Sequence, residues 1–240
     1  MKLLPHLLLG SALLMSVQAS QAAIALDRTR AIFNGDQKSI SLNINNENKQ
    51  LPYLAQAWLE DKDHKKITSP LTVVPPVQRL EPGTKSQISV SGTPALASLP
   101  QDRESVFYFN VREIPPRSDK ANVMQIALQT KIKLFYRPKA IVPAMGDVWQ
   151  EQVTLTKTAQ GYVIDNPTPY FVTVLNISGK PHGESSKNFQ ASMIAPKSSQ
   201  QVTSAVYDTP YVTFVNDYGG RPELKFACSG AACHFVPTKA

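Results

Sequence analysis

An alternating run of apolar and polar residues between Asn122 and Lys133 constrains the fold of this chain more than any other feature of its sequence. Met124, Ile126 and Leu128 recur with a period of two, which places them on one face of a β-strand and is incompatible with a helical stripe. Such a face must be covered. Either the chain's own sandwich core covers it, as is usual for an isolated strand of this kind, or another molecule does.

A second strand-like segment precedes this run and is expected to pair with it. It begins at Phe107 and is stopped by Pro115 and Pro116, which cannot continue a ladder. The polar residues 117–120 predict a short turn, and the alternating strand closes at Pro138. The two segments therefore predict one long hairpin.

The remaining sequence has the organisation of an all-β protein. A proline-bounded connector, 138–143, separates two sets of short β-like runs that alternate with turn residues, and no helical stripe of useful length occurs. The runs are 39–44, 56–59 and 86–90 before the connector, and 153–156, 162–164 and 171–177 after it. We expect two immunoglobulin-like β-sandwiches, 23–142 and 143–240.

The first 22 residues are typical of a secretory signal peptide. Lys2 provides a positive start, residues 7–14 an apolar stretch, and Ser20–Ala22 a small-residue cleavage site. The apolar stretch is too short for a membrane-spanning helix, so we expect export without membrane insertion. The remaining chain is about twice the ~100 residues of one sandwich.

The basic charge of the chain names no partner by itself. The formal charge of +7 falls by one when Lys2 is removed, and lysine and arginine are scattered rather than clustered. Because an exported protein does not meet nucleic acid, a solvated basic surface is the simplest interpretation, and no nucleic-acid partner is expected.

The two cysteines, Cys228 and Cys233, lie close together near the C-terminus. In an oxidising compartment this spacing favours a disulfide within a hairpin. A zinc site would need further ligands, and the histidines fall in no metal-ligand spacing; they are His6, His64, His182 and His234. We therefore expect a disulfide and no metal.

Sequence motifs for catalysis are missing. The chain has no G-x-S-x-G elbow, Walker loop, G-x-G-x-x-G turn or H-E-x-x-H helix, and Tyr218–Pro222 predicts a turn rather than a phosphate cradle. We expect neither an enzyme nor a cofactor.

Sequence blocks spread over most of the chain resemble the periplasmic chaperones of chaperone–usher pilus assembly. These blocks are 27–30, 48–58, 77–83, 110–116, 130–138, 166–170 and 216–222. The resemblance implies an L-shaped molecule with a cleft between the two sandwiches. It also implies a chaperone that folds and caps pilin subunits, without nucleotide, in the periplasm of a Gram-negative bacterium.

The resemblance assigns a subunit-binding role to two groups of residues. Arg30 and Lys133 match the pair that anchors the C-terminal carboxylate of a pilin subunit. Met124, Ile126 and Leu128 match the residues that fill the groove left by the strand a subunit lacks, and the short turn matches the short-loop branch of the family. Strict alternation, however, places Lys133 on the opposite face from these three residues, so a bulge or twist before Lys133 would be needed to bring them together.

A third group is structural in the resemblance, and the same resemblance names the partners. Glu104, Arg137 and Asp217 match an ion network across the domain junction that holds the cleft angle. The partners would be pilin subunits, the adhesin of a pilus and an outer-membrane usher, and the free chain could associate with itself. The alternative is a two-domain immunoglobulin-like adhesin or receptor fragment, in which Met124, Ile126 and Leu128 would be internally covered.

Overall fold

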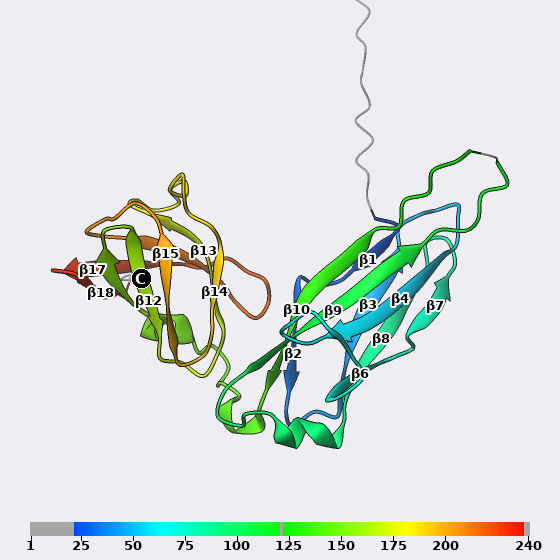
Figure 1. Cartoon of the computed structure of the whole chain (residues 1–240), viewed down its shortest axis with the longest axis horizontal. Coiled ribbons are helices and arrows are strands. Elements are labelled where there is room, and N and C mark those ends of the chain that lie inside the picture. Colours follow the sequence, from blue (N-terminus) through cyan, green and yellow to red (C-terminus); the bar gives the residue numbers. More distant parts are fainter. Residues whose placement is uncertain (1–21, 121, 238–240) are drawn as a thin grey trace, which may run out of the picture.

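The computed structural model describes residues 22–120 and 122–237 and builds them almost entirely from strands. The expected signal peptide lies outside the described residues except for Ala22. Two β-sandwiches, each with its own hydrophobic core, meet at an angle (Figure 1). The expected all-β, L-shaped architecture is confirmed.

The first sandwich packs a four-stranded sheet against a six-stranded sheet. The four-stranded sheet has the order β1 (Ile24–Leu26), β3 (Ser39–Asn46), β8 (Lys85–Gly92) and β6 (Leu71–Val74). The six-stranded sheet has the order β2 (Arg30–Asn34), β10 (Gln129–Arg137), β9 (Ser105–Ile114), β4 (Tyr53–Glu60) and β5 (Lys66–Ile67), with β7 (Val77–Leu80) also paired to β4. Alternate residues such as Ile44, Ile88, Phe109 and Leu134 point inward and form the core.

The second sandwich continues the chain after a connector that contains two short 3-10 helices, η2 (Lys139–Ile141) and η3 (Trp149–Gln152). Its strands follow the order β14 (Ser192–Ile194), β13 (Val172–Ser178), β16 (Tyr211–Val215), β17 (Glu223–Ser229), β18 (Ala232–Phe235), β11 (Thr154–Thr158), β12 (Gly161–Asn166) and β15 (Ser198–Thr203). Tyr162, Val174, Phe214 and Phe226 lie fully buried in its core.

Helices contribute little to the described part of the chain. Besides η2 and η3 there is η1 (Pro94–Ser98), which follows β8. Among the described residues, no helix is long and apolar enough to cross a membrane.

The structure corrects the extent of the predicted hairpin. β9 and β10 are antiparallel neighbours, but their ladder starts at Gln129 paired with Arg112, so the strand does not begin at Asn122 as expected. The connection is residues 115–128, longer than the predicted short turn. Pro115 and Pro116 follow β9 directly and donate no hydrogen bond, so the segment opposite them has no strand to pair with.

The expected disulfide is present between Cys228 of β17 and Cys233 of β18. The two cysteines face each other in the ladder, and Cys233 is fully buried in the core of the second sandwich. The bridge therefore ties the last two strands of the chain together.

We predict that Cys228→Ala with Cys233→Ala lowers the free energy of unfolding of the second sandwich by about 2 kcal/mol, because the closed loop is short. The first sandwich should be unaffected, since its core is separate. Urea unfolding followed by the tryptophan signal of each domain measures both effects. A loss of structure in the first sandwich would contradict the prediction.

Candidate functional site

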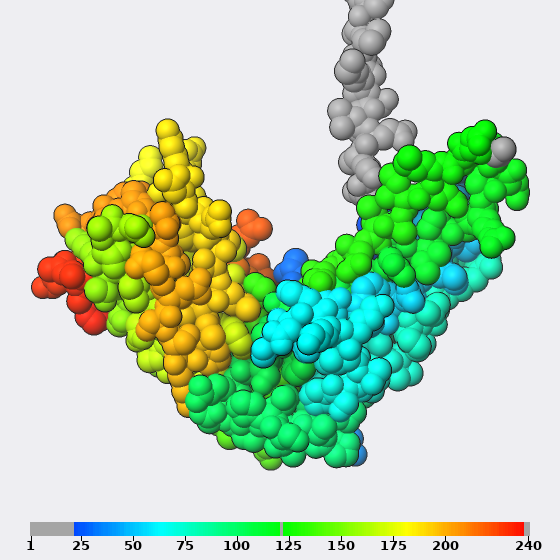
Figure 2. Space-filling view, in the orientation of Figure 1, coloured from blue at the N-terminus to red at the C-terminus, as the bar shows by residue number. Residues whose placement is uncertain are grey.

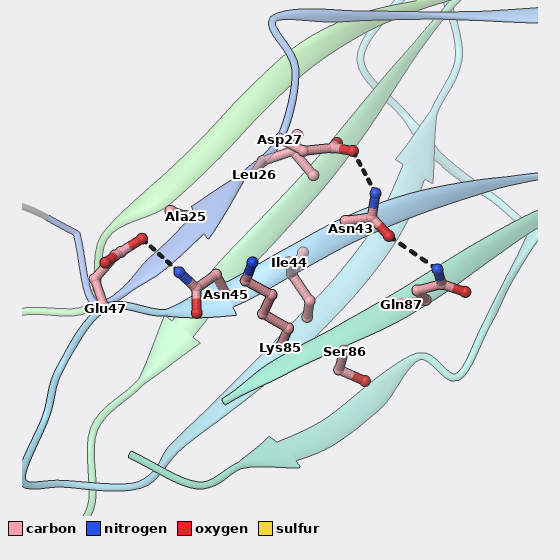
Figure 3. Close-up of a pocket in the computed structure, with 10 residues that line it drawn as sticks. All are labelled: Ala25, Leu26, Asp27, Asn43, Ile44, Asn45, Glu47, Lys85, Ser86 and Gln87. Atoms are coloured by element: carbon pink, nitrogen blue, oxygen red, sulfur yellow. Dashed lines mark hydrogen bonds between the residues drawn. The ribbon is translucent and has the colours of Figure 1, made fainter. Parts of the chain in front are cut away.

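The N-terminal segment divides between the two sheets of the first sandwich. β1 pairs with β3 in one sheet, whereas β2 pairs with β10 in the other. At the corner between them, Asn43 donates a hydrogen bond of 2.7 Å to Asp27, and Gln87 donates one of 2.9 Å to Asn43 (Figure 3). These side chains border a hollow on the four-stranded sheet. Their hydrogen bonds stabilise the segment in which the chain passes from one sheet to the other.

This change of sheet leaves part of β10 unpaired on one side. β2 pairs in parallel with β10 only from Lys133, opposite Arg30, to Arg137, opposite Asn34. In the described part of the chain, Gln129–Ile132 has β9 on one side and no strand on the other. An exposed edge of this kind presents backbone N–H and C=O groups that can pair with another chain.

Arg30 and Lys133 lie together where the free edge ends. They are opposite each other in the β2–β10 ladder and both are half-buried. Among the described residues neither has a carboxylate within ion-pair distance; Arg30 instead donates a long hydrogen bond of 3.4 Å to the carbonyl oxygen of Val215. The guanidinium also lies 5.8 Å from the centre of the Phe135 ring.

The surroundings of this cation pair disfavour its charge. Burial lowers the pKa of Lys133, and the nearby charge of Arg30 lowers it further. Burial also lowers the pKa of Arg30, against the weaker attraction of Asp217 and Glu104. A bound carboxylate would relieve both effects, because a charge-assisted hydrogen bond favours the protonated cation.

The three apolar residues that the sequence singled out lie just beyond this edge and face solvent. Met124 is 86% exposed, Ile126 67% and Leu128 37%, in the irregular segment that leads into β10. The chain's own core therefore does not cover them. A row of exposed apolar side chains on a chain of this size is typical of an interaction surface.

No bulge reorients Lys133. The β9–β10 ladder keeps one continuous register from Gln129 to Tyr136. Ile132 and Leu134 point into the core, whereas Lys131 and Lys133 lie on the outer face. The two cations and the three apolar residues therefore follow one another along the same edge of the sheet. They do not share one face of it.

A second ionic group occupies the outer face beside this edge, and the sequence analysis gave it no role. Lys131 Nζ lies 2.7 Å from Oε2 of the buried Glu60, and Trp58 Nε1 donates to Glu60 Oε1 at 2.9 Å. Burial acts to raise the pKa of Glu60, but the bonds from Lys131 and Trp58 outweigh it and hold the pKa below its ordinary value. The period-two spacing of Lys131 and Lys133 was the available signal, since it puts both on one face.

Glu104, Arg137 and Asp217 form an ion network across the domain junction. Arg137, the last residue of β10, is almost fully buried; its Nη1 lies 2.6 Å from Asp217 Oδ2 and its Nη2 2.7 Å from Glu104 Oε1. Glu104 Oε2 also accepts a hydrogen bond of 2.7 Å from the backbone of Phe171. The guanidinium carbon lies 4.9 Å from the centre of the Tyr170 ring.

The network shares one cation between two carboxylates. Burial raises the pKa of Glu104 to about 7, although the charge of Arg137 opposes this shift. The network connects the end of β10 to the second sandwich. Figure 2 shows a broad cleft between the two sandwiches. Within the described residues, no group of three or more metal-ligating side chains is placed to hold a metal ion.

Family models match both halves of the chain. Residues 23–142 match the model described as pili and flagellar-assembly chaperone, PapD N-terminal domain. Residues 148–226 match the model of the pili assembly chaperone PapD, C-terminal domain.

Whole proteins and solved structures show the same similarity. The chain is 56% identical over 228 residues to the chaperone protein PapD of Escherichia coli, covering 95% of each chain. It is 48% identical over 225 residues to the probable fimbrial chaperone YfcS of Escherichia coli strain K12, covering 92% of this chain and 90% of the relative. The crystal structure of the E. coli chaperone DraB, 27% identical, superposes with a TM-score of 0.72 over 87% of this chain and 97% of that one.

For the junction we predict that Glu104→Ala lowers the free energy of unfolding by about 1–3 kcal/mol, because Arg137 keeps Asp217 but loses one of its two carboxylate partners, and the backbone N–H of Phe171 loses its acceptor. Glu104→Gln should cost less, since an amide fills the same space. The pKa of Glu104 is about 7 in the folded state and near the ordinary 4.5 of a glutamate in the unfolded state, so the folded state binds more protons between these pH values. Wild type should therefore gain stability relative to Glu104→Gln as the pH falls from 7 to 4.5. Urea unfolding of both proteins at several pH values tests the sign; a difference that shrinks as the pH falls would contradict it.

Proposed function

Because this chain belongs to the PapD family of pilus-assembly chaperones, we propose that it binds pilin subunits in the periplasm by adding a strand along the free edge of β10. The subunit's C-terminal carboxylate binds Arg30 and Lys133. Met124, Ile126 and Leu128 enter the apolar groove of the subunit. The capped subunit, or the adhesin of the same pilus, is then passed to an outer-membrane usher.

The observation that carries this proposal is the coincidence of three features at one edge. The edge offers unpaired backbone groups, the half-buried cation pair has no carboxylate partner among the described residues, and the apolar row is exposed. Backbone pairing supplies general affinity, and side chains entering pockets supply specificity. None of the three features would be expected of an edge that only closes the chain's own sandwich.

The direction of the added strand follows from the position of the cations. Arg30 opens β2, which runs parallel to β10. A strand that lies along residues 124–132 and ends with its carboxylate at Arg30 must run the same way, in line with β2. We therefore propose parallel addition, in contrast to the antiparallel neighbour that β9 provides on the other side.

Energetics make the carboxylate anchor necessary. Full burial of Met124 and Ile126 contributes about 1.5–3 kcal/mol each, and Leu128 less because it is already partly covered. The costs of association and of bringing residues 122–128 into strand geometry offset much of this gain. A slip of one residue would also turn the apolar set away from the groove. The cation pair fixes one end and so selects the register.

The two sandwiches divide the work in this proposal, with the division near residue 142. The first binds the subunit, and the second closes the cleft at an angle that the network of Glu104, Arg137 and Asp217 maintains. The expected secretory signal, residues 1–22, would bring the chain to the periplasm. Mass spectrometry of the proteins that co-purify with the chain from periplasm tests the proposal directly; recovery of no pilin subunit would contradict it.

We predict that Arg30→Ala or Lys133→Ala abolishes subunit recovery while the chain stays folded. Loss of one partner of a partly buried charge pair costs about 2–5 kcal/mol of binding, roughly thirtyfold or more. Neither cation has an ion-pair partner in the described free chain, so Lys133→Ala should leave the free energy of unfolding near wild type, and Arg30→Ala should lower it only by the loss of a long hydrogen bond to Val215 and of the contact with Phe135. Lys85→Ala, on the opposite sheet, is the matched control. Wild-type recovery by the double variant Arg30→Ala with Lys133→Ala would rule out the anchor.

We further predict that Ile126→Glu abolishes subunit binding but leaves the free chain as stable as wild type, within about 0.5 kcal/mol, because the side chain faces solvent. In the complex the carboxylate would lie unpaired in an apolar groove, which is strongly unfavourable. Ala127→Glu is the control, since it adds the same charge one position away, where an extended segment points to the other face. Pull-down and urea unfolding are measured on both; equal subunit recovery by the two variants would contradict the proposal.

A further inference from the structure

Three cations lie on the outer face near the free edge, and only one of them is neutralised. Arg30 and Lys133 are opposite each other in the ladder, and Lys131 precedes Lys133 by two residues on the same face. Among the described residues, only Lys131 of the three has an ion-pair partner, Glu60. The edge would otherwise offer two places for a terminal carboxylate.

Glu60 also determines where the ammonium group of Lys131 lies. Glu60 belongs to β4, which is separated from β10 by β9. Lys131 Nζ, 2.7 Å from Glu60 Oε2, therefore lies over β9, 5.7 Å from the centre of the Tyr108 ring, and not toward the open edge. Trp58 Nε1 donates a hydrogen bond of 2.9 Å to the other carboxylate oxygen, Glu60 Oε1, and the His64 ring nitrogen Nδ1 lies 3.7 Å from Oε2.

The spacing of the two lysines makes this position important. Two residues along a strand correspond to about 7 Å, and side chains two residues apart share a face. A subunit strand whose carboxylate ended at Lys131 would keep every apolar side chain in phase with Met124, Ile126 and Leu128. The alternation of side chains rejects a slip of one residue, but it does not reject a slip of two.

We propose that Glu60 is a positioning residue that withdraws Lys131 from the edge, so that a subunit carboxylate binds only at Arg30 and Lys133 and the strand is selected for its length. This inference rests on the proposed function and adds to it a means of selecting the register of the bound strand. Glu60 acts in two ways: it holds the ammonium over β9, and its own negative charge repels a carboxylate at that position. The partner chemistry is an extended, alternating apolar strand with a free C-terminal carboxylate.

The test uses the full chain and synthetic peptides with the C-terminal sequence of the pilin subunit that co-purifies with it. One peptide has the natural end, one lacks the last residue, one lacks the last two, and one is amidated. Their dissociation constants are measured for wild type, Glu60→Gln, Glu60→Gln with Lys131→Gln, and Asp63→Asn. Asp63 is an exposed carboxylate that pairs with Lys62, so its replacement changes the net charge equally without releasing a cation at the edge.

Wild type should bind the natural peptide in preference to the one lacking two residues. Glu60→Gln should reduce that preference roughly two- to fivefold, the range given by a partly exposed ion pair, by binding the shortened peptide more tightly. The double variant and Asp63→Asn should keep the wild-type preference. The peptide lacking one residue should bind weakly to all four proteins, because its side chains are out of phase.

An unchanged length preference in a stably folded Glu60→Gln protein would overturn the inference. Gln keeps the acceptor for Trp58, so folding is expected, and urea unfolding checks it. If Glu60→Gln is unstable, Glu60→Asp replaces it, because the shorter side chain moves the carboxylate away from Lys131 by one methylene. Glu60→Asp should also reduce the preference for the natural peptide over the one lacking two residues. An unchanged preference in Glu60→Asp would overturn the inference as well. Failure of the proposed function is distinguishable, because wild type would then not discriminate the natural peptide from its amidated form.

Discussion

The division of the N-terminal segment between two sheets is the constraint on which the rest of the site depends. If β1 and β2 formed one continuous strand beside β10, its edge would be closed and no other chain could pair there. Because the chain changes sheets between Leu26 and Arg30, β2 covers only the second half of β10. The same change of sheet places Arg30 at the point where the open edge ends, so the backbone site and its cation arise from one feature.

The electrostatics of the outer face depend on which charges have partners. Arg137 is almost fully buried but satisfied by Glu104 and Asp217, so it joins the sandwiches and is not available to a ligand. Arg30 in β2 and Lys133 in β10 have no such partners among the described residues, and burial lowers the pKa of each because it disfavours the charged form. Paired cations maintain the architecture, whereas unpaired cations remain available for binding. The difference between the paired and the unpaired cations is visible in the ion-pair distances of the structure. The number of basic residues in the sequence does not reveal it.

The sequence predicted much of this, and its errors have physical causes. The strand-like runs of the sequence located eight of the 18 strands of the described chain, and the paired prolines located the end of β9, because both depend on local chemistry. The same alternation extended β10 too far, to Asn122, because a strand also needs a neighbour, and the neighbour is lost at Pro115. The pairing of Glu60 with Lys131 was not predicted, since it joins residues 71 apart in sequence across an intervening strand. Such a contact exists only once the sheet order is known.

The irregular segment before β10 shows how an apolar edge can remain usable. A long, flat, apolar edge strand is a site of aggregation, and proteins avoid it by shortening the regular strand and by placing charges on it. Here the ladder stops at Gln129, so Met124 and Ile126 project from backbone that is not part of a strand. Gln129 and Lys131 make the paired part of the edge polar. Apolar side chains and regular strand geometry are therefore kept apart in the described free chain. In the binding that we propose, a partner strand supplies the missing ladder, and its contacts with Arg30 and Lys133 offset the cost of bringing this segment into a strand.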